Sequence, residues 1–204
     1  FKKIYLLISF KSDDIKNELG LFYKSIPIVY IEDNKKLKPG TASALLNAID
    51  YLPEHFLLQY GDTILNIDYQ DFYNNSKNLK TGMLMSIFDN KNNLDKNNVF
   101  YKNNKLIYFN SESKNNIEKI KSSNFIDYGL LGIQKSFLME NLEILKTNEC
   151  LKFFQESLSY LNLIKPYLVN KRFYEIGTPQ SYMDFKNSYS KNELQEIINF
   201  ENNN

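Results

Sequence analysis

The sequence predicts an α/β fold: a Rossmann-like, doubly wound and mostly parallel sheet with helices on both faces, plus a small mixed β-hairpin region. Continuous apolar runs such as Lys3–Phe10 and His55–Tyr60 are typical of strands that are buried on both faces. Segments with helical spacing separate these runs, so strands and helices alternate along the first half of the chain.

The first half alternates strand and helix at short intervals. Strands are expected at Lys3–Phe10, Ile26–Ile31, His55–Tyr60 and Gly82–Phe88. Helices are expected at Ile15–Leu19, from Gly40 to about Leu52, and at Asp71–Asn78.

The second half has a more mixed pattern. Its predicted strands are a hairpin of Asn98–Tyr101 with Leu106–Phe109 around a central Asn-Asn, then Phe125–Ile133 and Leu163–Val169. Its predicted helices are Ser136–Leu145, Leu151–Leu161 and one that starts at Thr178-Pro179. With no repeat and no linker, residues 1–204 are expected to form one domain.

Composition excludes several kinds of protein. The 25 basic and 24 acidic side chains give a net charge of +1, so nothing indicates a nucleic-acid partner. One cysteine and one histidine, Cys150 and His55, argue against a disulfide, a Cys or His metal site and a Ser-His triad. A single cysteine also fits a reducing compartment, so we expect a cytoplasmic protein. No apolar run reaches the ~20 residues of a membrane span.

The apolar run His55–Tyr60 ends abruptly in Gly61-Asp62-Thr63. In open α/β sheets, ligands bind at the carboxyl ends of the strands. A carboxylate there suits a divalent metal, and a glycine lets a phosphate approach the backbone. The alternative is a simple turn, because Asp and Gly are common turn residues.

The predicted helix that opens with Gly40-Thr41-Ala42-Ser43-Ala44 has small residues at its start. Free backbone N–H groups at such a start attract anions. Close packing of the helix against the sheet would favour the same residues, so both interpretations stay open.

Three stretches occur in a characteristic order: Lys38–Ala44, the strand that ends in Gly61-Asp62, and Glu175-Ile176-Gly177-Thr178-Pro179. Together they resemble the sugar-1-phosphate nucleotidyltransferases, nearest to the bacterial D-glycero-D-manno-heptose 1-phosphate guanylyltransferase branch. The resemblance runs from about Lys3 to Tyr189. It implies an enzyme that forms an NDP-sugar and pyrophosphate from an NTP and a sugar 1-phosphate, for nucleotide-sugar or surface polysaccharide synthesis. It leaves homo-oligomerisation open.

The resemblance also assigns the nucleotide end of the site. Asp62 and Glu175 match the two acidic positions that bind Mg²⁺ and carry catalysis, although Asp is commoner than Glu at the second position. The nucleotide-binding positions that it implies are Pro39, Gly40, Thr41, Gly61 and Asp62. Thr178 has the simpler interpretation of a helix cap.

At the sugar-phosphate end, Asp127 and Gly129 match the strand where the family has Asn-Ala-Gly. Glu112 and Lys114 match a Glu-Lys pair of the family, but Ser113 intervenes here. A solvated loop is the alternative interpretation of that pair.

One family element has no counterpart in the 204 residues: the glycine-rich loop Gly-x-Gly-Thr-Arg. We therefore expect the sequence to begin after the first βα portion of the fold, which leaves Lys3–Phe10 with an apolar sheet edge.

Two alternative functions stay open. One is a non-catalytic module that binds a sugar phosphate or nucleotide; the other is a glycosyltransferase, whose usual Asp-x-Asp is replaced here by Gly61-Asp62-Thr63.

Overall fold

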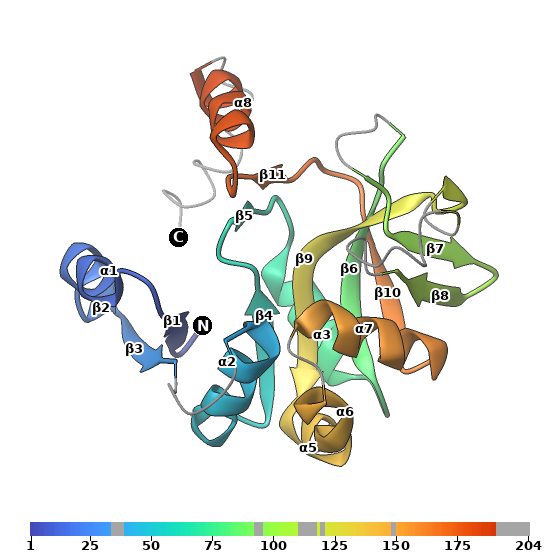
Figure 1. The fold of residues 1–204 in the computed structure, drawn as a ribbon, viewed down its shortest axis with the longest axis horizontal. Helices are drawn as coiled ribbons and strands as arrows, with labels where there is room; N and C mark the ends of the chain where they lie inside the picture. Colours follow the sequence, from blue (N-terminus) through green and yellow to red (C-terminus); the bar gives the residue numbers. More distant parts are fainter. Residues whose placement is uncertain (34–38, 92–95, 110–117, 119–120, 148–149, 191–204) are drawn as a thin grey trace.

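A six-stranded sheet forms the centre of the molecule (Figure 1). The computed structural model describes residues 1–33, 39–91, 96–109, 118, 121–147 and 150–190. The strands of the central sheet are β4 (His55–Gln59), β6 (Met83–Asp89), β7 (Val99–Lys102), β8 (Lys105–Tyr108), β9 (Phe125–Gln134) and β10 (Ile164–Val169).

The long strand β9 organises this sheet. It pairs antiparallel with β4 on one side and with β6 on the other, and β10 pairs parallel with β6. Strands β4, β6 and β10 therefore share one direction, with β9 reversed between β4 and β6. The α/β class is confirmed, and the pairing is more mixed than predicted because β9 returns after the β7–β8 hairpin to lie between two strands formed earlier in the chain.

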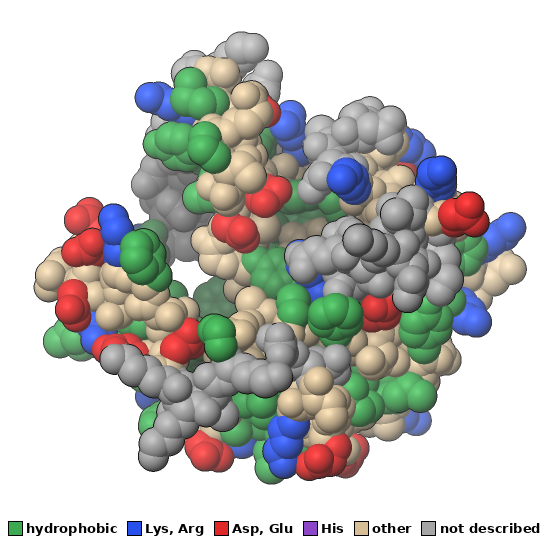
Figure 2. Space-filling model, viewed as in Figure 1, with side chains coloured by type: hydrophobic (Ala, Val, Ile, Leu, Met, Phe, Trp, Pro, Cys, Tyr) green, Lys and Arg blue, Asp and Glu red, His purple; other side chains and the backbone are tan. Residues whose placement is uncertain are grey.

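A smaller sheet forms from the N-terminal residues. Strand β1 (Ile4–Ile8) pairs parallel with β3 (Ile26–Glu32), and β2 (Phe22–Tyr23) pairs antiparallel with the start of β3. Among the described residues, β1 pairs only with β3 and β4 pairs only with β9. Within the described residues, each of these two strands thus has one edge without a neighbouring strand, and the surface is hollowed between the two sheets (Figure 2).

The described helices cover the sheets and connect their strands. They are α1 (Ser12–Leu19), α2 (Thr41–Ala48) with the 3-10 turn η1 (Ile49–Tyr51), α3 (Tyr69–Lys77), α5 (Lys135–Glu140), α6 (Leu142–Lys146), α7 (Leu151–Tyr160) and α8 (Pro179–Ser190). None of the helices in the described part of the chain is long and apolar enough to cross a bilayer.

Several helices differ from their predicted bounds, and two of these differences have a local cause. Helix α3 begins at Tyr69 because the Asp68 side chain caps it, accepting hydrogen bonds from the N–H groups of Gln70 and Asp71 at 2.9 Å. The predicted helix Ser136–Leu145 is divided at Asn141, whose side-chain amide donates to the carbonyl of Phe137 and competes with the helical backbone.

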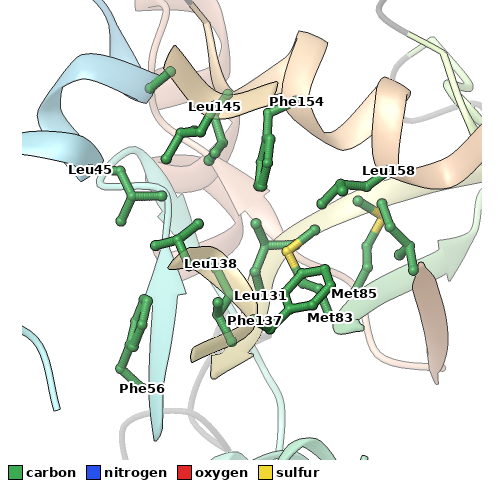
Figure 3. Packing of buried hydrophobic residues seen from close by; sticks show 14 of the residues in the cluster. Leu45, Phe56, Met83, Met85, Leu131, Phe137, Leu138, Leu145, Phe154 and Leu158 are labelled. Atoms are coloured by element: carbon green, nitrogen blue, oxygen red, sulfur yellow. The ribbon is translucent and has the colours of Figure 1, made fainter. Parts of the chain in front are cut away.

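The core has one cluster on each face of the central sheet. On one face, Met83, Met85 and Leu131 pack against α2, α5, α6 and α7, as Figure 3 shows for the side chains of Leu45, Phe154 and Leu158. On the other face, Leu84 and Leu130 pack against Phe72 of α3 and other apolar residues. Helices therefore cover both faces, as predicted, because alternate residues of β6 and β9 point to opposite sides.

The predicted hairpin is also confirmed. Asn103 and Asn104 join β7 to β8 with φ angles of 52° and 60°. Two successive positive φ angles match the right-handed twist of a two-residue hairpin, and Asn tolerates that conformation better than most residues.

Candidate active site

The turn that follows β4 presents Gly61 and Asp62 at its exposed tip. The N–H and hydroxyl groups of Thr63 donate to the carbonyl of Tyr60, at 3.4 and 2.9 Å, and close the turn. A Cβ placed on Gly61 would have no heavy atom within 4 Å, and Gly61 does not have a positive φ. Neither packing nor backbone conformation requires glycine there, so the space beside Gly61 is open to a ligand.

Asp62 and Glu175 are distant in the sequence but close in the structure. Strand β5 (Thr63–Ile64) pairs antiparallel with β11 (Tyr174–Glu175), and the Ile176 N–H donates to the Asp62 carbonyl at 2.7 Å. A Cβ placed on Gly177 would lie 2.9 Å from Asp62 Oδ2 and 3.1 Å from Glu175 Oε1. The two carboxyl groups are therefore directed at one small space, which any side chain at position 177 would fill.

Aromatic packing holds β11 in this place. The Phe173 ring makes an edge contact with Tyr128 at 5.2 Å between ring centroids, and Tyr128 is fully buried. The Tyr128 hydroxyl accepts a hydrogen bond from the Asn66 N–H at 3.2 Å. Tyr128 thus connects β9 to the segments on either side of the β5–β11 pair, which fixes the position of Glu175 relative to Asp62.

Strand β9 carries a bulge at the level of the site. Its register with β6 shifts between Met85 and Ile87, and Gly129 within the irregular stretch has a φ of 90°. The buried Ser86 hydroxyl fills the gap in the ladder by donating to the Leu130 carbonyl and accepting from the Leu130 N–H, at 2.9 and 3.1 Å. Bulges of this kind often occur next to active sites, where they redirect side chains.

The bulge brings Gly129 against the turn after β4. The Gly129 carbonyl accepts a hydrogen bond from the Tyr60 N–H at 3.1 Å. A Cβ on Gly129 would lie 3.0 Å from Thr63 Oγ1 and 3.2 Å from the Tyr60 ring. The predicted sugar-binding stretch therefore contacts the predicted metal-binding turn.

Asp127 is half-buried at the start of this bulge. Its Oδ1 accepts from the Gly129 N–H at 2.9 Å, and its Oδ2 accepts from Gln155 Nε2 at 3.2 Å. The Asp127 N–H donates to Asn98 Oδ1 at 2.8 Å and holds the backbone. Burial raises the pKa of the Asp127 carboxyl to about 6, although these hydrogen bonds and the charge of Lys152 oppose the rise.

Tyr60 and Gln155 also contact this site, and neither is predicted from the motifs. The Tyr60 hydroxyl donates to Gln155 Oε1 at 3.0 Å, and burial raises the pKa of Tyr60 well above its ordinary value. One signal for Gln155 is available in the sequence, because it interrupts the apolar stripe of Leu151, Phe154 and Leu158 on α7.

Thr41 joins the start of α2 to the start of α7. Its hydroxyl accepts from the Leu151 N–H at 2.9 Å and lies 3.7 Å from Cys150 Sγ. Gly40 precedes it with a φ of 151° and a ψ of 162°, a conformation open essentially to glycine alone, and Pro39 is exposed. The side chain of Thr41 therefore caps α7, the helix that carries Gln155.

Two solved structures share this arrangement of strands and helices. HddC from Yersinia pseudotuberculosis, a heptose 1-phosphate guanylyltransferase solved with GMP-PN, matches with a TM-score of 0.62 and 20% identity, over 90% of this chain and 76% of that one. The inositol-1-phosphate CTP transferase from T. maritima matches with a TM-score of 0.63 and 16% identity, over 88% of this chain and 72% of that one. The fold is that of the sugar-1-phosphate nucleotidyltransferases.

A curated relative agrees with this nucleotidyltransferase fold. The bifunctional protein GlmU of Methanococcus vannielii is 26% identical over 212 residues, which cover 99% of this chain. The chain spans about half the length of this relative, 48%. No protein-family model matches the sequence. The resemblance inferred from the motifs is thus confirmed.

The remaining residues of the predicted site differ in where the structure places them. Glu112 and Lys114 lie outside the described residues. Thr178 caps α8, because its hydroxyl accepts from the Ser181 N–H at 3.1 Å. Within the described ranges, no group of three or more His, Cys, Asp or Glu side chains could hold a metal. Asp62 and Glu175 form a pair of carboxylates, not a complete protein cage.

Proposed function

We propose that the protein is a nucleotidyltransferase that forms an NDP-sugar and pyrophosphate from an NTP and a sugar 1-phosphate. The observation that carries this proposal is the convergence of Asp62 and Glu175 beside Gly177, directly after strand β4. The names of the relatives, which are transferases for heptose and inositol phosphates, support the same general reaction.

Asp62 and Glu175 would hold Mg²⁺ in this proposal. Their oxygen atoms are aimed at one space, and Mg²⁺ in nucleotide sites usually takes one or two carboxylates together with waters and substrate phosphates. When bound, the ion would neutralise charge on the triphosphate and on the departing pyrophosphate. Two carboxylates that share a site repel each other, so their proximity itself favours a cation between them.

The other residues would position the two substrates. The open space beside Gly61 allows a phosphate to approach the backbone of the turn. Gly129 contacts this turn, and the Asp127 carboxylate accepts a hydrogen bond from the Gly129 N–H. A sugar held there would present its phosphate to the nucleotide. Holding two reactants in line is the main source of rate in such displacements, since little covalent chemistry is left to the protein.

A pyrophosphate-release screen of the intact protein, with the common NTPs against a panel of sugar 1-phosphates, tests this proposal. We expect one pair to release pyrophosphate, Glu175→Gln to reduce the rate strongly and Glu175→Asp to retain part of it. Glu143→Gln is the matched control, because Glu143 is an exposed acid paired with Lys146. Binding of both substrates with no release from any pair would contradict the proposal and favour the non-catalytic alternative.

A further inference from the structure

Gln155 is a polar side chain on the inner face of α7, and its exposed fraction is 0%. Its neighbours on the helix, Phe154 and Leu158, point into the core with the sheet residues (Figure 3). A buried amide is costly unless its donors and acceptor are satisfied. The partners of Gln155 therefore determine what it does.

Both partners of Gln155 belong to the candidate site. Its Nε2 donates to Asp127 Oδ2 at 3.2 Å, and its Oε1 accepts from the Tyr60 hydroxyl at 3.0 Å. Only one orientation of the amide satisfies both contacts, because one end donates and the other accepts. Tyr60 has a single hydroxyl proton, and its contact with Asp127 is longer, at 3.5 Å.

The Asp127 carboxyl group is thus held at both oxygen atoms. The backbone of Gly129 fixes Oδ1, and Gln155 fixes Oδ2. Each oxygen of a carboxylate has a second lone pair, so the held group can still accept hydrogen bonds from a ligand. It cannot donate one while it is ionised.

We propose that Gln155 is a positioning residue for substrate recognition, which orients Asp127 to accept hydrogen bonds from the hydroxyl groups of the sugar phosphate. This inference rests on the proposed function. It predicts a site that selects hydrogen-bond donors on the sugar, so that a deoxy or fluoro sugar phosphate binds less tightly than the parent sugar.

The pKa of Asp127 supplies a test, because a Gln155 side chain that only packs in the core would not change this pKa. Among the described residues, the titratable groups that face Asp127 are Tyr60, from the turn after β4, and Lys152, from α7. Burial raises the pKa of Asp127 to about 6, and the hydrogen bond from Gln155 lowers it. Loss of that hydrogen bond must raise the pKa further, so the accepting form of Asp127 would appear only at higher pH.

NMR of the Asp127 carboxyl carbon, without ligand, measures the titration midpoint of Asp127 directly in the Gln155→Met and Gln155→Glu variants. The first keeps the side-chain length and removes both hydrogen bonds; we expect the midpoint to rise by roughly one pH unit, the size of one hydrogen bond to a charged group. The second places a carboxyl beside Asp127 and should raise the midpoint more. Gln134→Met is the control, since Gln134 donates to the Leu79 carbonyl at the other end of β9.

Turnover of the intact protein gives the second measurement. At a pH near the wild-type midpoint, Gln155→Met should raise the KM for the sugar 1-phosphate that supports turnover by about fivefold, because the ionised fraction of Asp127 falls from about a half to about a tenth. The KM for the NTP should stay within about twofold, and the defect should diminish as the pH is raised.

An unchanged Asp127 midpoint in Gln155→Met, with a cooperative melt, would overturn the inference. If that variant does not fold, Gln155→Glu replaces it, and an unchanged Asp127 midpoint there would also overturn the inference. If the wild-type protein turns over no sugar phosphate, the proposed function fails, and the ligand-free titration still decides whether Gln155 orients Asp127.

Discussion

At the scale of single residues, two glycines differ in what surrounds them: Gly61 lies beside open space, and Gly132 lies in a close packing contact. A Cβ on Gly61 would meet no atom within 4 Å, whereas a Cβ on Gly132 would lie 2.2 Å from Ser76 Oγ. Gly132 is therefore required by the contact between α3 and β9. Gly61 has no such requirement, so the space beside it is open to a ligand.

This contrast predicts opposite effects of two alanine substitutions. Gly61→Ala should leave the free energy of unfolding unchanged within about 0.5 kcal/mol and weaken NTP binding. Gly132→Ala should destabilise the fold by about 1–3 kcal/mol, because α3 must move. Urea unfolding and calorimetric NTP titration measure the two quantities. Wild-type NTP affinity in Gly61→Ala would show that the open space is not used.

The raised pKa of the half-buried Asp127 predicts a pH-dependent stability. Its pKa is about 6 in the folded protein and near the ordinary 3.8 when unfolded, so the folded state binds more protons between these values. The free energy of unfolding should therefore fall as the pH rises through this window. Asp127→Asn lacks this titration, and its stability relative to wild type should increase by about 1–3 kcal/mol between pH 4 and 7.

Urea unfolding of the wild type and Asp127→Asn at several pH values provides the measurement. Asp184→Asn is the control, because Asp184 is an exposed residue on α8 whose carboxylate accepts a hydrogen bond from Gln180. Parallel pH profiles for the wild type and Asp127→Asn would contradict the assigned burial of this carboxyl.

At the scale of elements, most strands and helices follow from local pattern, and their pairing does not. The apolar runs predict β4 and β6, and the Asn-Asn dipeptide predicts the hairpin. The reversed position of β9 between β4 and β6 depends on contacts between distant parts of the chain, which no local pattern encodes. The bulge in β9 and the contact of Gln155 with Tyr60 depend in turn on that pairing.

One edge of β1 is not covered by any strand of the described residues, and this predicts self-association of the 204-residue chain. An uncovered edge is a template for pairing with another strand, and a lysine on it blocks that pairing. Leu6→Lys should therefore reduce association without unfolding the protein. Leu168→Lys on the edge strand β10 is the control, because Pro166 already lies in that strand. Light scattering across a concentration series is the measurement, and a monodisperse wild-type monomer with a cooperative melt would contradict the prediction.

At the scale of the whole molecule, the candidate site forms where three structures meet: the turn after β4, the bulge of β9 and the β5–β11 pair. The motif order predicts that Asp62 and Glu175 belong together, since each lies in a short recognisable stretch. It does not predict Tyr60, Ser86 or Gln155, because these residues reach the site only through the register of β9 and the rotation of α7. Local motifs thus identify the carboxylates, and tertiary pairing supplies their surroundings.

Calorimetric titration of the intact protein with NTP, in the presence and absence of Mg²⁺, measures whether Asp62 and Glu175 bind the metal ion that accompanies the nucleotide. Asp62 is exposed at the tip of its turn, so Asp62→Asn should melt like the wild type and yet lose most of the Mg²⁺-dependent part of NTP binding. Asp50→Asn, at an exposed acid of η1, should keep that dependence. Equal Mg²⁺ dependence in Asp62→Asn and the wild type would contradict the assignment of Asp62 as a metal ligand.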